Sequence, residues 1–362
     1  MEKKFRVLAI NPGSTSTKVG IYEGETMLYE GTVRHSREEL AVFPTIYSQK
    51  DMRMELVKKL VEENGYKVSE MDAFIGRGGI IRPLKHSGVY AIGEALKDDL
   101  INLPSAQRHA SMLGGIIAGA WGEEYGKPAF IADPVTVDER REIAKITGLP
   151  NVKRDCIFHC LNQKAACRYY CKLNGKKYEE VNLIVAHMGG GISVAAHDHG
   201  RIVDVNDTMT GEGPFTPERC GALPVKAVVD MMVDEGKTRE EIYKYIAGKG
   251  GFMAHFNTNS ALDVEKMIEA GDEHAKLIYD AMAYNISKTV GEMATVLCGD
   301  VEAVILTGGL AYGKMLTDYI TEHVKFIAPV VIYPGEGELS ALAAGANRVL
   351  CGEEEAREYP GE

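Results

Sequence analysis

Several features that mark other classes of protein are missing from this 362-residue sequence. No apolar run approaches the roughly 18 residues that a membrane-spanning helix needs. Met1-Glu-Lys-Lys4 leads directly into a short strand pattern, without the apolar region of a signal peptide. Basic residues are not in excess, because 41 Lys and Arg stand against 52 Asp and Glu for a net charge of −11. We therefore expect a cytoplasmic protein that binds neither a membrane nor nucleic acid.

Two familiar nucleotide-binding motifs are also absent. The chain has no Gly-x4-Gly-Lys-Ser/Thr P-loop, and no Gly-x-Gly-x-x-Gly opens a helix inside a βαβ unit. Its seven cysteines fit reduced thiols. Cys156, Cys160, Cys167 and Cys171 recur at helical spacing beside His159. This pattern is more typical of small buried thiols on a helix face than of zinc ligands, which leaves a metal site there as the weaker alternative.

A strand–turn–strand signature occurs twice, half a chain apart. The first copy spans residues 6–22 around Asn11-Pro-Gly-Ser-Thr-Ser-Thr-Lys18, and the second spans residues 182–197 around His187-Met-Gly-Gly-Gly191. A repeat at half the chain length indicates two related lobes. A turn of small residues exposes N–H groups and hydroxyls, which suit a phosphate.

Strand and helix patterns alternate after each copy of the signature. The remaining patterns predict strands at residues 25–32, 71–75, 128–132, 302–306 and 326–333, and helices at 51–63, 93–101, 106–124, 224–235, 239–247, 263–270, 273–298 and 338–350. Such βα units favour a mixed sheet with parallel members. No linker rich in Pro or Ser divides the lobes. We expect residues 1–134 with 340–362 to form an N-terminal lobe on the acid and phosphoryl side, and residues 135–339 a C-terminal, nucleotide-binding and dimerising lobe, with a hinge at 133–138.

Three Gly-rich segments follow predicted strands directly, at residues 11–16, 187–191 and 307–309. Ligands of α/β sheets bind outside the carboxyl ends of strands, so three such segments are poorly explained as turns alone. The candidate phosphate- and cofactor-binding residues are Asn11, Ser14, Ser16, Lys18, His187, Gly189, Gly190, Gly191, Thr307, Gly308 and Gly309. Two alternatives stay open: Asn11 as a simple turn residue before Pro12, and Lys18 as a lysine on a strand face.

Two arginines lie in loops of small residues, where a solvated helix-face charge is a poor explanation. Arg77 stands in Ile75-Gly-Arg-Gly-Gly79, and Arg219 in Gly213-Pro-Phe-Thr-Pro-Glu-Arg-Cys-Gly221. A planar guanidinium matches the charge on a transferring phosphoryl group and grips a carboxylate with two bonds. We predict catalytic or substrate-binding roles for both arginines.

Histidines and carboxylates complete the candidate set. His109, His159 and His187 flank small residues, although a lone histidine is more often packed than catalytic. His187 occupies the turn position that matches Asn11, and His159 precedes a helix pattern, where it suits donation to a phosphoryl group. Asp133, Asp138 and Glu338 are candidate Mg²⁺ anchors, because Mg²⁺ takes one or two carboxylates with phosphate oxygens and water. Glu338 fits equally as a first-turn helix carboxylate.

Five segments, taken together, resemble the butyrate kinases, a branch of the acetate kinase (acetokinase) family in the superfamily of actin, heat-shock chaperone ATPases and sugar kinases. They are residues 11–18, 76–79, 187–191, 213–219 and 306–310. The resemblance implies an α/β fold with two duplicated ribonuclease H-like (actin-like ATPase) lobes around a central cleft. It also implies reversible, ATP- and Mg²⁺-dependent phosphorylation of a short carboxylate by in-line transfer with ADP as product, and a homodimer or larger assembly.

Site roles follow from the same resemblance, position by position. It implies that Arg77 and Arg219 flank the transferring phosphoryl group and the carboxylate, and that His159 hydrogen-bonds that group. The same matching implies that phosphate and metal are placed by Asn11, Asp133 and Glu338, and that ATP phosphates are bound by residues 187–191. It also implies that the adenosine is approached by Gly308 and Gly309, and that an active-site histidine on the substrate side corresponds to His109. Ser260 and Leu262 stand where many relatives have an acidic and a basic residue near the nucleoside.

Two other functions remain as alternatives. An acetate or propionate kinase would share the phosphate residues and differ only in the pocket for the acyl chain. An actin-like or chaperone-like ATP-binding module would keep the Gly loops but would need no arginine that grips a carboxylate. Arg77 and Arg219 argue against this module.

Overall fold

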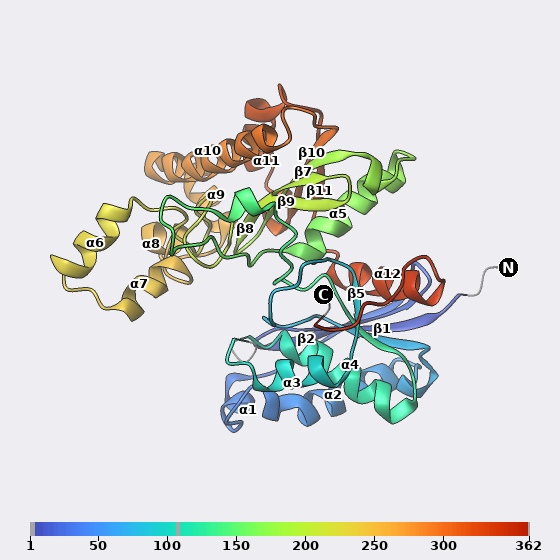
Figure 1. Cartoon of the computed structure of the whole chain (residues 1–362). Coiled ribbons are helices and arrows are strands. Elements are labelled where there is room, and N and C mark those ends of the chain that lie inside the picture. The colour runs from blue at the N-terminus through green and yellow to red at the C-terminus, as the bar shows by residue number, and fades with distance from the viewer. Residues whose placement is uncertain (1–3, 106–108, 361–362) are drawn as a thin grey trace. The chain divides into compact units, whose positions relative to one another are not determined.

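The computed structural model describes residues 4–105 and 109–360. The chain divides into two compact units, each described here by itself. Unit 1 comprises Met1–Asp138 and Gly337–Glu362, and unit 2 comprises Glu139–Glu336. Figure 1 labels their elements along the chain.

Unit 1 is built on one mixed sheet in the order β3-β2-β1-β4-β6-β5. Its strands are β1 (Arg6–Pro12), β2 (Ser16–Glu23), β3 (Thr26–Arg34), β4 (Ala73–Gly76), β5 (Val89–Ala91) and β6 (Ala129–Ala132). β1, β2 and β3 form an antiparallel meander, whereas β4 runs parallel to β1, and β6 runs parallel to β4. The carboxyl ends of β1, β4 and β6 therefore meet at one edge of the sheet.

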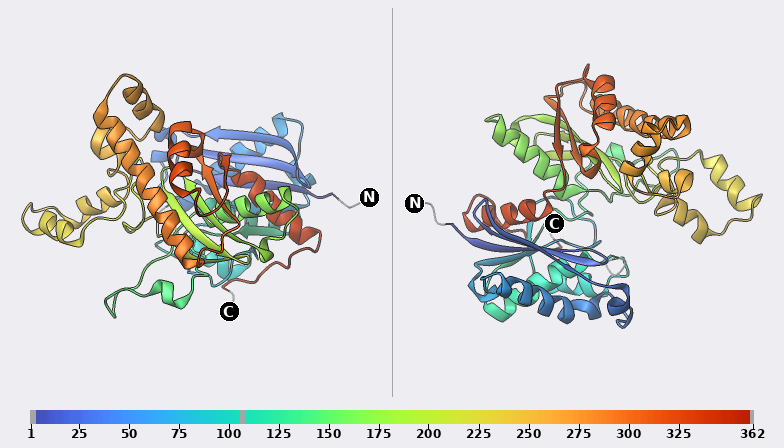
Figure 2. Two further views of the ribbon diagram at one scale, coloured as in Figure 1. Left: turned by 90° about the horizontal axis from the view of Figure 1, so that it is seen from above. Right: turned by 180° about the vertical axis from the view of Figure 1, so that it is seen from behind.

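Helices cover both faces of this sheet. They are α1 (Arg37–Ala41), α2 (Lys50–Glu63), α3 (Glu94–Asn102), α4 (Met112–Tyr125) and α12 (Glu338–Leu350). α4 packs on β1, β4 and β6 with α2 and α3 beside it, and α12 packs on the opposite face (Figures 1 and 2). The last helix of the chain thus belongs to the unit that begins the chain.

Unit 2 repeats this strand plan in the order β11-β10-β7-β8-β9. Its strands are β7 (Asn182–Met188), β8 (Ile192–Asp198), β9 (Arg201–Val205), β10 (Ala303–Gly308) and β11 (Val330–Pro334). β7, β8 and β9 form the antiparallel meander, and β10 lies parallel to β7 as β4 lies parallel to β1. The duplicated strand frame agrees with the sequence repeat.

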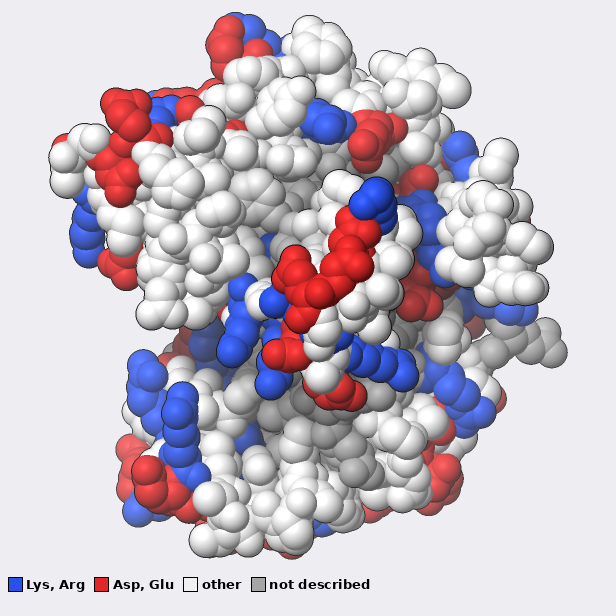
Figure 3. All heavy atoms as spheres, turned by 90° about the vertical axis from the view of Figure 1, so that its left-hand side faces the viewer, with Lys and Arg blue, Asp and Glu red and all other residues white. Residues whose placement is uncertain are grey.

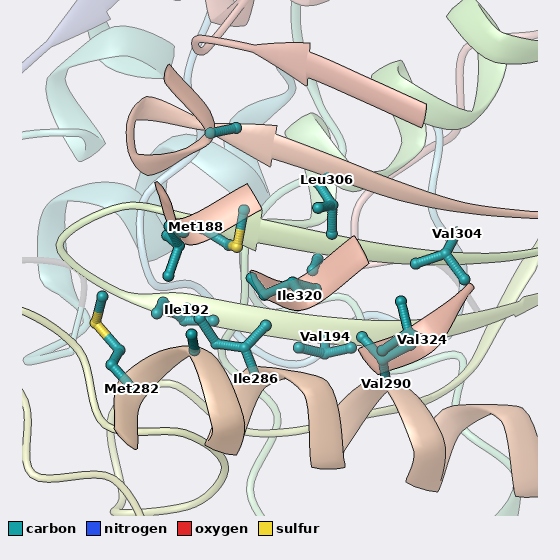
Figure 4. Packing of buried hydrophobic residues seen from close by; sticks show 14 of the residues in the cluster. Met188, Ile192, Val194, Met282, Ile286, Val290, Val304, Leu306, Ile320 and Val324 are labelled. Atoms are coloured by element: carbon teal, nitrogen blue, oxygen red, sulfur yellow. The ribbon is translucent and has the colours of Figure 1, made fainter. Parts of the chain in front are cut away.

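The helices of unit 2 are α5 (Cys160–Leu173), α6 (Val225–Val233), α7 (Arg239–Ile246), α8 (Phe252–Phe256), α9 (Ala261–Glu269), α10 (Glu273–Val296) and α11 (Lys314–Val324). Alternate residues of β7 face opposite ways, so that Ile184 packs toward α10 and Val185 packs toward α5. Figure 4 shows the α10 side, where Met282, Ile286 and Val290 lie against the sheet. On the other face, Cys167 and Cys171 of α5 are buried free thiols.

Figure 3 shows acidic and basic side chains mixed over the face it draws, in keeping with the moderate net charge. Within the described ranges, no helix combines the length and apolarity that crossing a bilayer requires.

The boundaries differ from the expected ones where the pattern is short or interrupted. The helix expected from residue 106 begins at Met112, with residues 106–108 outside the described ranges. The strand expected from residue 326 begins at Val330, because Phe326 is 82% exposed and lies outside the sheet. α1, β5 and α8 were not predicted, since elements of three to five residues show no hydrophobic period. The 11-residue helix α11 was not predicted either.

Candidate active site

The first turn (residues 11–16) joins β1 to β2 in unit 1, and a buried arginine holds its backbone. The N–H of Gly13 donates to the carbonyl of Ser16 at 2.7 Å. The guanidinium of Arg53, from α2, donates to the carbonyls of Gly13 at 3.0 Å, Ser14 at 3.2 Å and Ser16 at 3.1 Å. Each of these acceptors is a neutral oxygen, and burial lowers the pKa of Arg53 to about 10. The role of Arg53 was not predicted, because in the sequence it looks like any other charged residue on a helix.

The remaining candidates of the first turn are open to solvent. Ser14 and Lys18 are exposed, and Ser16 is half-buried. Lys18 pairs with Asn11 across β1 and β2, which puts the two side chains on the same face of the sheet. The structure therefore fits both the phosphate role and the strand-face alternative for Lys18.

Arg77 is fixed by its backbone at the end of β4. Its N–H donates to the carbonyl of Ile10 at 3.0 Å, and its carbonyl accepts from the N–H of Gly115 at 3.1 Å. α4 approaches so closely that a Cβ on Gly76 would lie 1.9 Å from the carbonyl oxygen of Gly114. The glycines around Arg77 thus allow a helix to lock the loop from which the guanidinium projects.

Glu338 joins Arg77 to Asn11. Its Oε1 lies 2.8 Å from Nη1 of Arg77, and its Oε2 accepts a hydrogen bond from the side-chain amide of Asn11. Glu338 opens α12 and is 9% exposed. The structure therefore brings together three predicted site residues that lie far apart in the sequence, and one carboxylate orients both the arginine and the amide.

Asp133 follows β6 at the same sheet edge and has an unusual backbone. Its φ is +40°, its side chain is buried, and its Oδ1 accepts from the N–H of Gly88 at 2.7 Å. A positive φ in a non-glycine residue is strained and often marks a functional site. Asp138, the third predicted carboxylate, is half-buried, and its N–H donates to the carbonyl of Leu84.

The chemistry of these carboxylates can be tested against Mg²⁺. Asp133 and Glu338 offer the hard oxygens that the ion prefers, and Mg²⁺ needs only one or two of them beside phosphate and water. Among the described residues, no group of three or more His, Cys, Asp or Glu could hold a metal. The residues therefore fit an ion held mainly by phosphate oxygens and water, rather than one caged by protein.

His109 lies just before α4 and is exposed. The N–H of Ser111 donates to its Nδ1 at 3.1 Å, and the Ser111 hydroxyl lies 3.0 Å from the same nitrogen. These contacts hold the imidazole against the start of α4.

The second turn (residues 187–191) occupies the matching position in unit 2. The N–H of Gly189 donates to the carbonyl of Gly191 at 2.9 Å. The guanidinium of Arg219 lies directly over Gly191, because a Cβ there would come within 2.4 Å of Nη1. Thr216 ties the two segments together: its hydroxyl donates to the carbonyl of Gly190 at 2.7 Å and accepts from the N–H of Arg219 at 3.0 Å. The fold thus places a cation on a Gly-rich turn of the kind that binds phosphate.

Arg219 is half-buried and held at one end. Its Nη1 donates to the carbonyl of Thr208 at 2.6 Å. Burial lowers the pKa of Arg219, while the negative charges of Glu218 and Asp207 oppose that shift. The guanidinium therefore stays charged in a setting of reduced solvation, where its interaction with an anion is strengthened.

The third Gly-rich segment (residues 307–309) ends β10 beside the second turn. Thr307 pairs with His187 in the parallel ladder. Gly308 has φ +91°, and a Cβ there would lie 2.4 Å from the carbonyl oxygen of Met188. Gly309 differs, because no atom lies within 4 Å of an added Cβ. Packing explains Gly308, whereas Gly309 leaves room for a ligand to approach the backbone.

The rings of His159 and His187 contact each other in unit 2 at an interplanar angle of 34°. Their ring centroids are 4.3 Å apart, and Nδ1 of His159 lies 2.9 Å from the hydroxyl oxygen of Ser193. His187 is buried and its Nε2 lies 3.9 Å from Oε1 of Glu336, whereas His159 is half-buried at the start of α5. Unit 2 therefore gathers His159, His187, the Gly-rich turn and Arg219.

A small pocket adjoins Arg219, with room for no more than about one water molecule. Its lining combines the apolar side chains of Ile192, Pro214 and Ile246 with the polar ones of Thr208, Glu212 and Thr216. The sequence did not reveal this pocket, because its walls come from three separate segments.

Ser260 and Leu262 are the positions at which this sequence departs from the family pattern, and both have ordinary structural surroundings. The Ser260 hydroxyl caps α9 by accepting from the N–H of Asp263 at 3.2 Å, and Leu262 is 67% exposed.

Comparisons with known proteins identify the relatives of this chain. The acetokinase family profile matches residues 148–328. The chain is 47% identical to butyrate kinase 2 and 48% identical to butyrate kinase 1 of Clostridium acetobutylicum, in each case over 98% of this chain and 99% of the relative. Acetate kinase from Porphyromonas gingivalis has a similar structure, with a TM-score of 0.77 at 20% identity over 94% of this chain and 99% of that one. Acetate kinase from Entamoeba histolytica has a TM-score of 0.73 at 17% identity, over 94% and 98%. These structures confirm the predicted fold of two duplicated actin-like α/β lobes.

Proposed function

Because the chain belongs to the acetokinase family, we propose that it transfers the γ-phosphoryl group of ATP reversibly to the carboxylate of butyrate or a branched short-chain fatty acid. The products are an acyl phosphate and ADP. One observation carries the proposal: the Arg219 guanidinium lies against Gly191 of the second turn, and Thr216 ties the two segments together. A cation fixed on a Gly-rich turn suits the transfer of a phosphoryl group.

The reaction needs no covalent enzyme intermediate. A carboxylate oxygen of the substrate attacks the γ-phosphorus, an O–P bond forms, and the bond to the β-phosphate oxygen breaks as ADP leaves. Catalysis then consists of positioning and of stabilising the charge on the equatorial oxygens.

In unit 2, Arg219 stabilises that charge, and His159 donates a hydrogen bond to the same phosphoryl group. The N–H groups of Gly189, Gly190 and Gly191 bind the phosphates of ATP. Thr307, Gly308 and Gly309 serve the nucleotide, where the open space at Gly309 supports a close approach of the adenosine.

In unit 1, Arg77 grips the substrate carboxylate, and Glu338 holds the arginine in place through their 2.8 Å contact. Asn11 orients a phosphoryl oxygen, with Ser14, Ser16 and Lys18 of the same segment as further phosphate contacts. Asp133 and Glu338 would hold Mg²⁺, which when bound neutralises charge on the phosphate oxygens. His109 remains a prediction on the substrate side.

Acetate and propionate offer fewer apolar contacts than butyrate, and each methylene changes the discrimination by only about 1–3 kcal/mol. The ratio of kcat/KM for butyrate or isobutyrate to that for acetate therefore separates this proposal from an acetate or propionate kinase. A ratio below one would favour the latter.

We further propose a cytoplasmic homodimer or larger homo-oligomer. The side chains of Val225, Val229 and Val233 on α6 are 79%, 51% and 73% exposed, and such apolar surface is often covered in an assembly. Sedimentation equilibrium of the purified protein tests this, and a monomer at all concentrations would contradict it.

The decisive test traps the product with hydroxylamine in the presence of ATP, Mg²⁺ and butyrate. Wild-type protein should form the hydroxamate, and Arg219→Ala should lower kcat by at least about 10²-fold while the fold is retained. Arg239→Ala is the matched control, because Arg239 lies on α7 and contacts Tyr243 on the same helix. A folded Arg219→Ala protein with wild-type turnover would refute the role of Arg219, and wild-type protein that forms no hydroxamate would favour an ATP-binding module.

A further inference from the structure

A line of buried polar side chains in unit 2 ends at His159. Ser193, Gln163 and His197 are fully buried and Tyr178 is 4% exposed. The line runs from the Tyr178 hydroxyl to Nδ1 of His197 at 2.6 Å and from Nε2 of His197 to Oε1 of Gln163 at 3.0 Å. It continues from Nε2 of Gln163 to the Ser193 hydroxyl at 3.1 Å, and from that hydroxyl to Nδ1 of His159 at 2.9 Å. We call these five residues the His159 polar chain.

The amide of Gln163 sets the direction of these hydrogen bonds. Its Nε2 lies 2.9 Å from the carbonyl oxygen of Ser193 and 3.3 Å from that of Val185. Backbone carbonyls only accept, so the NH₂ group must face them and Oε1 must face His197. His197 therefore donates from Nε2, and its Nδ1 accepts from the Tyr178 hydroxyl.

The charge state of His197 agrees with this assignment. Burial lowers the pKa of His197 to about 3, and the nearby Lys164 ammonium acts in the same direction. Lys164 is itself paired with Glu139 at 2.8 Å and donates to the carbonyl of Gly200 at 2.7 Å. His197 is consequently neutral, with one donor and one acceptor nitrogen.

The same donor and acceptor rules apply to His159 at the other end of the polar chain. Ser193 accepts a hydrogen bond from Nε2 of Gln163, so its own hydroxyl hydrogen is available for Nδ1 of His159. An Nδ1 that accepts leaves the imidazole proton on Nε2. The ring of His187, tilted by 34° with its centroid 4.3 Å away, packs against the His159 ring.

We propose that Gln163 and Ser193 are positioning residues that hold His159 in the Nε2–H tautomer. This inference rests on the proposed function, in which His159 donates to the transferring phosphoryl group. The opposite tautomer would turn a lone pair toward the phosphoryl oxygens and remove the donor. Neither Gln163 nor Ser193 touches the reacting atoms, so both act only through His159.

The test reads the tautomer directly, in the full-length protein without substrate. Histidine is labelled with ¹⁵N, two-bond ¹H–¹⁵N correlation spectra are recorded, and His159→Gln assigns the signals of His159. The wild-type protein should show His159 protonated on Nε2 alone. Ser193→Ala should give a mixture of tautomers and lower kcat about tenfold, the effect of one hydrogen bond, with KM for ATP and butyrate nearly unchanged.

A second variant should release the polar chain. Gln163→Met removes the amide that donates to the Ser193 hydroxyl, so this hydroxyl is no longer held as the donor to His159, and a mixture of His159 tautomers should appear. Ser287→Ala is the control, because Ser287 is a mostly buried serine on α10 whose hydroxyl donates to the carbonyl of Ala283 and not to the polar chain. It should leave the His159 signals and kcat unchanged.

The outcomes separate this inference from the proposed function. A wild-type spectrum with His159 protonated on Nδ1 overturns the inference, whatever the stability of the variants. Failure of the wild-type protein to form a hydroxamate overturns the proposed function, whereas the tautomer is read from the spectrum in the absence of substrate. A normal wild-type tautomer with no change in Ser193→Ala would also overturn the positioning role.

Discussion

The first and second turns occupy the same place in the duplicated strand frame, yet each is held by a different arrangement. Beneath the first turn, the buried Arg53 donates to the carbonyls of three turn residues. Over the second turn, Arg219 lies against Gly191 with one guanidinium nitrogen bound to the carbonyl of Thr208. Each turn therefore has an arginine within contact distance, and the two arginines differ in the groups that surround them.

Burial and hydrogen bonding separate the two arginines. Arg53 is 0% exposed, and its nitrogens are engaged by turn carbonyls and by the side chains of Gln49 and Thr17. Arg219 is half-buried at the rim of a pocket. The comparison teaches that duplication preserved the strand frame and the Gly-rich turns, while each half acquired its own support for the turn.

The largest effect is expected from breaking the support of the first turn. Arg53→Met leaves the carbonyls of Gly13 and Ser14 without this donor and the carbonyl of Ser16 with the N–H of Gly13 alone. It also removes the buried contacts of Arg53 with Gln49 and Thr17, and together these losses should lower the free energy of unfolding by about 3 kcal/mol. Urea unfolding measures the change. Lys59→Met is the matched control, because Lys59 lies on the same helix with a side chain 70% exposed, and it should stay within about 0.5 kcal/mol of wild type. If both variants unfold alike, Arg53 does not support the turn.

Replacing one glycine in each turn by alanine tests the two arrangements directly. In Gly191→Ala the new Cβ would lie 2.4 Å from Nη1 of Arg219, whereas in Gly13→Ala its nearest contact would be Oγ of Ser16 at 3.5 Å, an ordinary van der Waals distance. Displacement of Arg219 should lower kcat/KM for butyrate about 10²-fold, with a much smaller loss for Gly13→Ala. Steady-state kinetics on both variants test the difference. Equal losses would contradict the claim that Gly191 is required by the arginine above it.

The sequence predicted those parts of the site that depend on where strands end. Asn11, Arg77 and Asp133 follow β1, β4 and β6, and a parallel arrangement brings such ends to one edge. The family resemblance then supplied the expected roles, and it grouped the distant Glu338 with Asn11 and Asp133. The glycines of the second turn were found because they stand in a repeat.

The support of each turn was beyond the reach of the sequence. Arg53 stands among charged residues in Lys-Asp-Met-Arg-Met-Glu, and nothing local tells that it is buried while Lys59 is exposed. Gln163 and Ser193 belong to α5 and β8, and their contact depends on how the helix lies across the sheet. Long-range packing decides these features, and a single sequence contains no periodic signal for it.

The smallest effect concerns pH and sharpens the contrast between the two supports. The first turn rests on an arginine that stays charged at neutral pH, whereas the polar chain beside the second turn contains a neutral histidine. The pKa of His197 is about 3 in the folded protein, below its ordinary value of about 6.5. Between these values the unfolded chain binds more protons, so stability is present above about pH 6.5 and is lost as pH falls toward 3.

His197→Gln should remove that part of the pH dependence while keeping a donor for Gln163. In wild type, His197 contributes a slope of up to about 1.4 kcal/mol per pH unit below pH 6.5, and the variant should lose it. Urea unfolding at several values between about pH 4.5 and 7.5 measures both slopes. His35, whose pKa burial also lowers, contributes equally to the two proteins and cancels in the comparison. Identical slopes would mean that His197 is not held neutral, and the direction assigned to the polar chain would then lose its support at Gln163.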